Sequence, residues 1–266
     1  MPRANRHYLS GYIWHITHRC HKKEFLLKFS RDRHRWLEWL FEAKKRYGIR
    51  ILDYMVTSNH IHLLVVDGGH EVIPKTMQLI AGRTAQEYNL RKTRKGAFWE
   101  DRYHATAVQS NRHLMQCMTY IDLNMVRAGA VHHPSEWPFS GYHEIRNPRE
   151  RYALLDYQGL LGMFNIKSID ELRGFYSGQI EHALESGHMV RESKWSDSLA
   201  VGDQPYVEEI KAKLGLRAEW RKPREIGEGY ELREPLSPYD NDFTPKNGLL
   251  MPENTYFWNV YPQKNK

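Results

Sequence analysis

The sequence predicts an α+β fold, a ferredoxin-like βαββαβ antiparallel sheet with packed helices, followed by a mostly helical C-terminal extension. Three observations lead to this fold class. Over residues 1–145, strand-like and helix-like segments follow one another in the order strand, helix, strand, strand, helix, strand. A short turn joins the two consecutive strands, and a further helix follows the last strand. After about Pro138, prolines punctuate the chain and the apolar patterns are helical.

The first strand and the first helix are predicted at residues 11–19 and 30–47. The strand segment alternates and is rich in residues that favour β-structure. Ser30 is suited to cap the helix and Gly48 to end it. The helix carries an apolar stripe made of Trp36, Leu37, Leu40 and Phe41.

A hairpin is predicted next, with strands at residues 49–57 and 60–66 and a turn at Ser58 and Asn59. The other elements of this half are a helix at 73–92, a strand at 103–108 and a helix at 112–127, for which Asn111 offers a cap and Gly129 an end. This order gives a four-stranded sheet with two crossover helices and one further helix beside it.

The later part of the chain has a different character. Residues 152–190 and 205–216 have helical patterns, and the segment from 217 is rich in Pro, Gly and charge. We therefore expect a compact domain at 1–145, a helical extension at 146–216 and an extended or partly disordered tail at 217–266.

The charge of the chain is unevenly distributed. Residues 1–145 hold 22 lysines and arginines against 13 acidic residues, whereas the rest holds 17 against 19. A basic half favours a polyanionic partner, of which nucleic acid is the commonest. No run of about 18 apolar residues predicts a membrane span, and the N-terminus lacks the apolar core of a signal peptide. We expect a cytoplasmic location. The two cysteines are too few for a disulfide framework.

Two histidines form the most informative pattern. His60 and His62 are two residues apart on a predicted strand, so their side chains point to the same face. Two imidazoles on a rigid strand suit a divalent metal ion. The alternative is a pair of exposed histidines without a ligand, which is the commoner case for an isolated His-x-His.

A tyrosine on the third helix is the second candidate. Tyr120 and Asn124 are four residues apart and reach the same region of space. A tyrosine hydroxyl is a nucleophile that can form a covalent intermediate, and a nearby cation helps it attack a phosphate. Asn124 offers a neutral oxygen that would complete a His-His-Asn site. The alternative is a tyrosine that only packs and hydrogen-bonds.

With these residues the chain resembles the HUH-type single-tyrosine transposases, in particular the REP-associated tyrosine transposases. The resemblance covers about residues 1–145 in the order of the family. The matching stretches are 11–17, 55–66 (MVTSNHIHLLVV), 96–103 (GAFWEDRY), 120–129 (YIDLNMVRAG) and 137–142 (WPFSGY).

The resemblance implies a metal-dependent enzyme that cleaves and joins single-stranded DNA beside hairpins. It makes His60, His62 and Asn124 the ligands of Mg²⁺ or Mn²⁺, and Tyr120 the nucleophile that forms a 5′-phosphotyrosine link. Two departures stand out. Met125 occupies the usual place of a proline, which affects the helix near Asn124. Asn124 replaces the glutamine of the related insertion-sequence enzymes, which would weaken metal binding.

Several further residues are candidates for contact with nucleic acid. Basic side chains near the second and third helices are expected to contact phosphates: Arg83, Arg91, Lys92, Arg94, Lys95, Arg102 and Arg127. Phe98 and Trp99 either stack on a base or pack in the core. A zinc site is a weak alternative for His15, His18, Cys20 and His21, because an odd spacing prevents His15 and His18 from sharing a strand face.

Two other functions compete with the transposase interpretation. A domesticated relative would bind DNA or RNA hairpins with little or no cleavage. A histidine-dependent RNA phosphodiesterase would need paired His-x-Thr/Ser motifs, and only residues 15–17 resemble one. The sequence leaves open the target hairpin, the choice between monomer and homodimer, and the role of residues 146–266.

Overall fold

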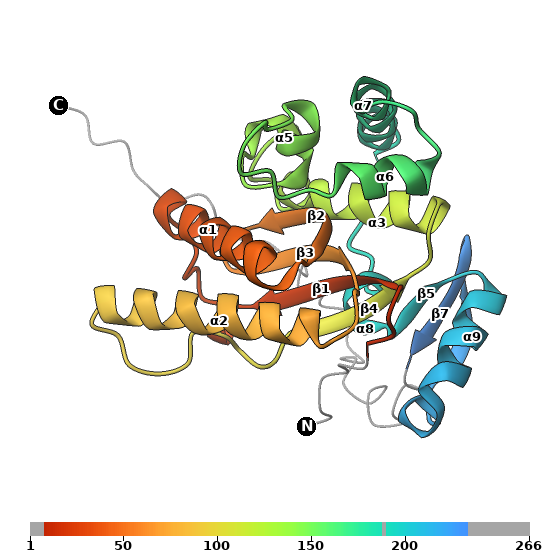
Figure 1. The fold of residues 1–266 in the computed structure, drawn as a ribbon, viewed down its shortest axis with the longest axis horizontal. Helices are drawn as coiled ribbons and strands as arrows, with labels where there is room; N and C mark the ends of the chain where they lie inside the picture. The colour runs from red at the N-terminus through yellow and green to blue at the C-terminus, as the bar shows by residue number, and fades with distance from the viewer. Residues whose placement is uncertain (1–7, 188–189, 234–266) are drawn as a thin grey trace, which may run out of the picture. The chain divides into compact units, whose positions relative to one another are not determined.

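The computed structural model describes residues 8–187 and 190–233, and its first half has the predicted order of elements (Figure 1). These elements are β1 (Ile13–Arg19), α1 (Ser30–Tyr47), β2 (Arg50–Val56), β3 (His60–Val66), α2 (Val72–Arg91) and β4 (His104–Val108). A short 3₁₀ turn, His21–Lys23, follows β1. The four strands pair antiparallel in the spatial order β2-β3-β1-β4. This is the ferredoxin-like arrangement, so the predicted fold class is confirmed.

The register of β1 against β3 divides the sheet into two chemically different faces. Thr17 lies opposite His62, and Arg19 lies opposite His60. Since directly paired residues share a face, these polar side chains all point to one side. The residues between them point to the other side, where α1 and α2 pack next to each other. There Trp99 stacks on His18 and donates a hydrogen bond to the Ala81 carbonyl of α2, at 3.0 Å.

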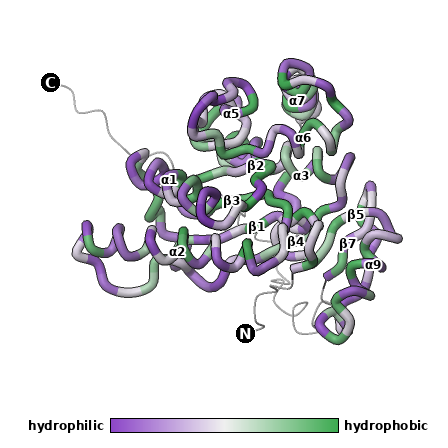
Figure 2. The backbone as a smooth tube through the Cα atoms, viewed as in Figure 1, coloured by the Kyte–Doolittle hydropathy of each residue, from purple (hydrophilic) through white to green (hydrophobic). Residues whose placement is uncertain are grey.

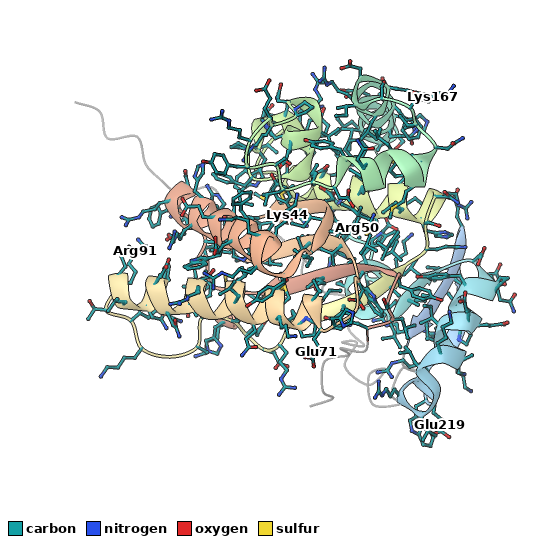
Figure 3. All side chains as sticks on the ribbon, viewed as in Figure 1. Lys44, Arg50, Glu71, Arg91, Lys167 and Glu219 are labelled. Carbon is teal, nitrogen blue, oxygen red and sulfur yellow. The ribbon has the colours of Figure 1, made fainter. Side chains whose placement is uncertain are left out.

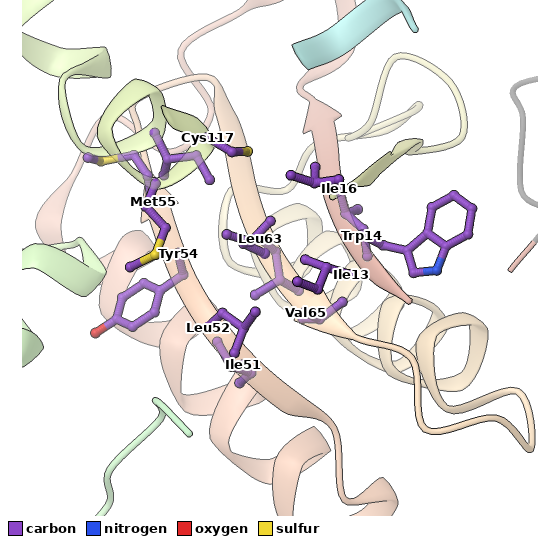
Figure 4. Close-up of a cluster of buried hydrophobic side chains, with 14 of the residues drawn as sticks. Ile13, Trp14, Ile16, Ile51, Leu52, Tyr54, Met55, Leu63, Val65 and Cys117 are labelled. Atoms are coloured by element: carbon purple, nitrogen blue, oxygen red, sulfur yellow. The ribbon is translucent and has the colours of Figure 1, made fainter. Parts of the chain in front are cut away.

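The core fills both sides of this sheet. Figure 4 shows Met55 of β2 beside Cys117 of the third helix, with Leu63, Ile16 and Trp14 on the adjacent strands. All five side chains are buried. Figure 2 shows apolar residues concentrated along the central strands, while the polar residues lie mainly on the outer surfaces of the helices. In the parts of the chain that the structure describes, no helix could cross a lipid bilayer.

The helix ends agree only partly with the sequence prediction. Gly48 ends α1 in the left-handed conformation, with φ 68°, as expected for a residue without Cβ. Ser30 is already helical, and Phe29 occupies the cap position. Asn111 does precede the third helix, but its side chain makes no capping hydrogen bond. The predicted helix at 112–127 is divided at Leu123 into α3 (Arg112–Asp122) and α4 (Asn124–Arg127).

The C-terminal extension contains helices, as predicted, and also three strands. After α4, the described residues form η2 (Pro134–Glu136) and α5 (Gly141–Arg146) at the end of the predicted domain. They then form α6 (Tyr157–Phe164), α7 (Ile169–Glu185), α8 (Lys194–Asp197), β5 (Ala200–Gly202), α9 (Gln204–Leu214) and η3 (Gly215–Ala218), and, in the predicted tail, β6 (Lys222–Ile226) and β7 (Gly229–Arg233).

The three additional strands extend the sheet to seven, in the order β2-β3-β1-β4-β5-β7-β6. β5 has three residues and pairs parallel to β4, and β6 with β7 forms a hairpin. Thus residues 217–233, where we expected an extended or partly disordered chain, form a 3₁₀ turn and a hairpin. Sequence patterns gave no sign of these strands, because β5 is too short to alternate and β6 is mostly charged. Residues 234–266 of the predicted tail lie outside the described residues.

Polar contacts fasten the extension to the first half, and they are made by Lys44 and Arg50, which are labelled in Figure 3. The Lys44 ammonium of α1 donates to the carbonyls of Ala153 and Leu154, at 2.9 and 2.8 Å. Arg50 of β2 forms an ion pair with Asp156 at 2.7 Å. These cations satisfy backbone oxygens and a carboxylate where the chain crosses back over β2, so the segment before α6 is held on the sheet.

One close approach within this packing is testable. Gly141, the first residue of α5, lies against Asp53 of β2, and a Cβ at this position would overlap a carboxylate oxygen. We predict that Gly141→Ala lowers the free energy of unfolding by about 1–3 kcal/mol, because the buried Asp53 has no room to move.

Chemical denaturation of both variants measures this effect. The control is Gly162→Ala in α6, where a Cβ would meet no atom within 4 Å. That change should raise the free energy of unfolding by roughly 0.5–1 kcal/mol, since alanine favours a helix interior. Equal stability of the two variants would contradict the close packing of α5 on β2.

Candidate active centre

The structure brings the two histidines, Tyr120 and Asn124 together on one face of the sheet. The ring centroids of His60 and His62 are 5.0 Å apart, and those of His62 and Tyr120 are 6.0 Å apart. The Asn124 amide nitrogen lies 3.0 Å from Nε2 of His62. The alternation of β3 places both histidines on this face, and the helical spacing of four residues places Tyr120 and Asn124 above them.

Local hydrogen bonds fix the ring of His60. Its Nδ1 lies 2.7 Å from the Asn59 side-chain oxygen and 2.9 Å from the Thr57 hydroxyl. That hydroxyl donates its own hydrogen to the His60 carbonyl at 2.8 Å, so its oxygen is left to accept. Both neighbours of Nδ1 are therefore acceptors, which places the hydrogen on Nδ1 and leaves the Nε2 lone pair free.

His62 is fixed by contacts at both ring nitrogens. Its Nδ1 lies 2.9 Å from Nε2 of His15 on the neighbouring strand β1. The other nitrogen of His15, Nδ1, lies 2.8 Å from the backbone carbonyl oxygen of Trp195. His15 is fully buried and His62 is 3% exposed, so water does not compete for these hydrogen bonds.

Burial keeps all three rings neutral. It lowers the pKa of His15 and that of His60 to about 3, and it lowers the pKa of His62 well below its usual value. Around His60 the positive charges of Arg19, Arg191 and Arg127 lower the pKa further. Neutral imidazoles with free Nε2 lone pairs are the form that binds a metal ion.

Three arginines direct positive charge at this centre. Arg127 of α4 lies 4.1 Å above the centroid of the Tyr120 ring and donates to the Tyr120 carbonyl at 2.7 Å. Arg19 lies opposite His60 in the register of β1 and β3. Arg191 comes from the C-terminal extension and, with Arg127, opposes the rise in the pKa of Tyr120 that burial causes.

Sequence analysis singled out Arg127 but missed the other two arginines. The alternation of β1 offered a signal for Arg19, because residues 15, 17 and 19 share the histidine face. Arg191 had no such signal, since only the tertiary fold brings the extension to this place.

The extension also covers the tyrosine. Trp195 of α8 is fully buried, with its ring centroid 6.2 Å from that of Tyr120. Behind it, the Thr106 hydroxyl of β4 donates to the Ser198 carbonyl at 2.6 Å and holds this segment on the sheet. Tyr120 is 6% exposed as a result. The sequence left the role of this region open, and the structure places it against the candidate nucleophile.

The donor set fits a divalent cation. Nε2 of His60 and Nε2 of His62 face Asn124, whose amide would present its oxygen to a cation after a half-turn of the side chain. No group of three or more His, Cys, Asp or Glu side chains that could hold a metal ion occurs among the described residues. A third ligand from this chain would thus be the neutral Asn124 amide. Two nitrogens and one oxygen leave further coordination positions of a divalent cation open to other oxygen ligands.

Most of the other predicted nucleic-acid contacts lie elsewhere. Arg83 and Arg91 belong to α2, and Lys92, Arg94 and Lys95 follow it, so this run lies with the helices on the face opposite Tyr120. Arg91 forms an ion pair with Asp32 of α1 (Figure 3). Arg94 donates to the Ala97 carbonyl at 2.9 Å. Arg102 is exposed in the segment before β4.

The weak zinc alternative is not supported by the geometry. His15 and His18 point to opposite faces of the sheet, as their spacing predicted. His18 stacks on Trp99 with centroids 4.1 Å apart, and its Nε2 lies 2.9 Å from the Asp101 carbonyl. Burial raises the pKa of Cys20 to about 12, which disfavours the thiolate that zinc requires. Phe98 is 2% exposed and packs in the core.

Part of the chain is similar to known transposases. Residues 8–124 match the family model described as "Transposase IS200 like". One similar solved structure is that of a REP-associated tyrosine transposase bound to a REP hairpin, with 20% identity, a TM-score of 0.46, and coverage of 54% of this chain and 84% of that chain. Another is a candidate transposase from Deinococcus radiodurans, with 17% identity, a TM-score of 0.32, and coverage of 46% and 96%. A search of the curated proteins found no match.

The buried His18 leads to a prediction about acid stability. Burial lowers the pKa of His18 to about 4, so the folded chain keeps the ring neutral while the unfolded chain takes up a proton below about pH 6.5. Stability is therefore lost as the pH falls from about 6.5 towards 4. We predict that His18→Phe reduces the loss between pH 7 and pH 5 by about 2 kcal/mol.

Urea denaturation at the two pH values measures this difference. Replacement of the exposed His132 by Phe serves as the control and should leave the pH dependence of stability unchanged. An identical pH dependence in His18→Phe and the unmodified chain would contradict the prediction.

Proposed function

We propose that this chain cleaves and rejoins single-stranded DNA through Tyr120, and the match of residues 8–124 to the family model described as "Transposase IS200 like" supports this proposal. The observation that carries the proposal is the meeting of Tyr120 with two neutral histidines and three arginines on one face of the sheet. This arrangement offers a nucleophile, a place for a divalent cation and positive charge for a phosphate.

In the proposed reaction the Tyr120 oxygen attacks the phosphorus of a DNA phosphodiester. The bond to the 3′ oxygen breaks, that oxygen takes up a proton, and the 5′ phosphate stays on Tyr120 as a phosphotyrosine. A 3′ hydroxyl then attacks the phosphotyrosine and restores a phosphodiester and the free tyrosine. Because one phosphoester replaces another in each step, no external energy source is required.

The residues of the centre have two proposed roles, metal binding and stabilisation of the deprotonated Tyr120. His60, His62 and Asn124 would hold Mg²⁺ or Mn²⁺, which when bound supplies positive charge beside the scissile phosphate. Burial raises the pKa of Tyr120, so loss of its proton depends on nearby positive charge. Arg127 lies over the tyrosine ring and provides such a charge, and Arg191 acts in the same direction.

The substrate in this proposal is single-stranded DNA beside a hairpin. The surplus of cations in residues 1–145 supports a polyanionic substrate. Arg83, Lys92, Lys95 and Arg102 are exposed and would contact phosphates away from the scissile bond. A hairpin is proposed because a structurally similar transposase was solved bound to one.

A hairpin-binding module with little cleavage is the second candidate. The observation in its favour is the cover over the nucleophile, since Tyr120 is 6% exposed and Trp195 lies beside it. Cleavage requires Tyr120 to reach a phosphate, so the segment around α8 must move or the DNA must enter along the arginines. Formation of a covalent adduct distinguishes the two candidates.

The first test is adduct formation with labelled hairpin-bearing single strands and Mn²⁺. We predict a slowly migrating protein–DNA adduct on a denaturing gel that disappears in Tyr120→Phe and in the presence of a chelator. Tyr152→Phe, at an exposed position, should form as much adduct as the unmodified chain. Adduct in Tyr120→Phe would refute the role of Tyr120, and binding without adduct across many hairpins would favour the binding module.

A second test concerns the arginines that sequence analysis missed. We predict that Arg19→Ala and Arg191→Ala each weaken binding of single-stranded DNA and reduce the salt slope of binding by about 1, because each removes one phosphate contact.

Arg224→Ala provides a control with the same change of charge, since Arg224 lies on the edge strand β6. Fluorescence anisotropy at several salt concentrations measures both affinity and slope. If the Arg224 variant and the other two lose affinity equally, the positive charge acts only through the net charge of the chain.

A further inference from the structure

We propose that His15 is a positioning residue for His62, and that the C-terminal extension takes part in the active centre by fixing His15 through the Trp195 carbonyl. The inference rests on the proposed role of His62 as a metal ligand, and it assigns functions to a histidine and an extension outside the predicted site. It starts from three hydrogen bonds in a row, from Trp195 through His15 and His62 to Asn124.

The first hydrogen bond decides the tautomer of His15. A backbone carbonyl oxygen can only accept, so Nδ1 of His15, 2.8 Å from it, must carry the hydrogen. A neutral imidazole has a single N–H, and the full burial of the His15 ring disfavours its charged form. Its Nε2 is consequently an acceptor that faces His62.

The second hydrogen bond passes this constraint to His62. Nε2 of His15 accepts, so Nδ1 of His62, at 2.9 Å, must donate. Nε2 of His62 then keeps its lone pair, directed at Asn124. The rings of His15 and His62 are within 5° of parallel, which suits a hydrogen bond in the plane of both rings. The tautomer that His62 needs as a metal ligand is thus already fixed in the metal-free protein.

The constraint does not depend on Asn124. As placed, the Asn124 amide nitrogen donates to Nε2 of His62 and agrees with the same tautomer. A bound cation would turn the amide oxygen inward and remove that donor. The Trp195 carbonyl lies at the other end of the chain of hydrogen bonds and is unaffected, so it maintains the tautomer of His62 in both situations.

Backbone pairing holds the hydrogen-bonded row of Trp195, His15 and His62 in place. His15 lies directly opposite Leu64 on β3, two positions along the ladder from the pair of Thr17 and His62, and opposite Thr106 on β4. The Thr106 hydroxyl donates to the carbonyl of Ser198, the residue directly after α8, and lies 3.4 Å from the carbonyl oxygen of Trp195. The extension is therefore bound to the same strand pair that carries the histidines.

The test observes the tautomer of His62 in the metal-free protein, by nitrogen NMR of ¹⁵N-labelled histidine rings at pH 7. We expect His62 to show a protonated Nδ1 and a bare Nε2. His15→Phe removes the acceptor, and His62 should then populate the tautomer with hydrogen on Nε2. The affinity for Mn²⁺, measured by calorimetry, should fall by roughly 10–100-fold in that variant.

Two variants separate positioning from packing. His15→Gln keeps a side-chain acceptor towards His62 and should recover much of the Mn²⁺ affinity that His15→Phe loses. His113→Phe removes another buried histidine, on α3, and should leave both the His62 tautomer and Mn²⁺ affinity unchanged. If His15→Phe does not fold, Thr106→Val loosens the Trp195 segment and should give a mixture of His62 tautomers, whereas Thr106→Ser should not.

The outcomes also separate this inference from the proposed reaction. A protonated Nε2 on His62 in the unmodified protein would overturn the inference, as would an unchanged tautomer and Mn²⁺ affinity in His15→Phe. If the tautomer and affinity respond as expected but no Tyr120 adduct forms, the proposed cleavage fails and the role of His15 stands. If the adduct forms but the His62 tautomer and the Mn²⁺ affinity do not change in His15→Phe, the proposed cleavage stands and the role of His15 is refuted.

Discussion

The antiparallel pairing of β1 with β3 is the constraint on which the rest of the centre depends. It places Arg19 opposite His60 and brings His15 within hydrogen-bond distance of His62. A slip of one residue in β1 would turn Arg19 and His15 towards α1 and α2 and separate His15 from His62. The register is held because the residues between the polar ones, such as Trp14 and Ile61, fill the core on the other face.

Burial and positive charge act together around the candidate nucleophile. Burial keeps His60 and His62 neutral, which preserves their lone pairs, and it also raises the pKa of Tyr120. Arg127 and Arg191 oppose this second effect. A site with neutral ligands and neighbouring cations is short of negative charge, and a DNA phosphate would supply it. The electrostatics therefore favour an anionic substrate independently of any family relationship.

The C-terminal extension changes how the domain boundary should be understood. Residues 8–124 carry the family match, yet Trp195 and Arg191 lie outside it and reach the tyrosine and the histidines. The extension also lengthens the sheet through β5, which pairs parallel with β4. In this chain the ferredoxin-like strands and the strands of the extension share one sheet, and residues from both parts lie around Tyr120.

The sequence by itself determined strands β1 to β4, the face shared by His60 and His62, and the four-residue spacing of Tyr120 and Asn124, because periodicity in strands and helices is a local property. It also showed why His15 and His18 cannot act together. Only the tertiary structure decided that His15 lies within hydrogen-bond distance of His62, that the basic run around α2 lies on the opposite face, and that Trp195 packs beside Tyr120. These relations join segments up to 180 residues apart in the chain, as His15 and Trp195 are. No local pattern encodes such a contact, since it arises from the way the packed elements close on one another.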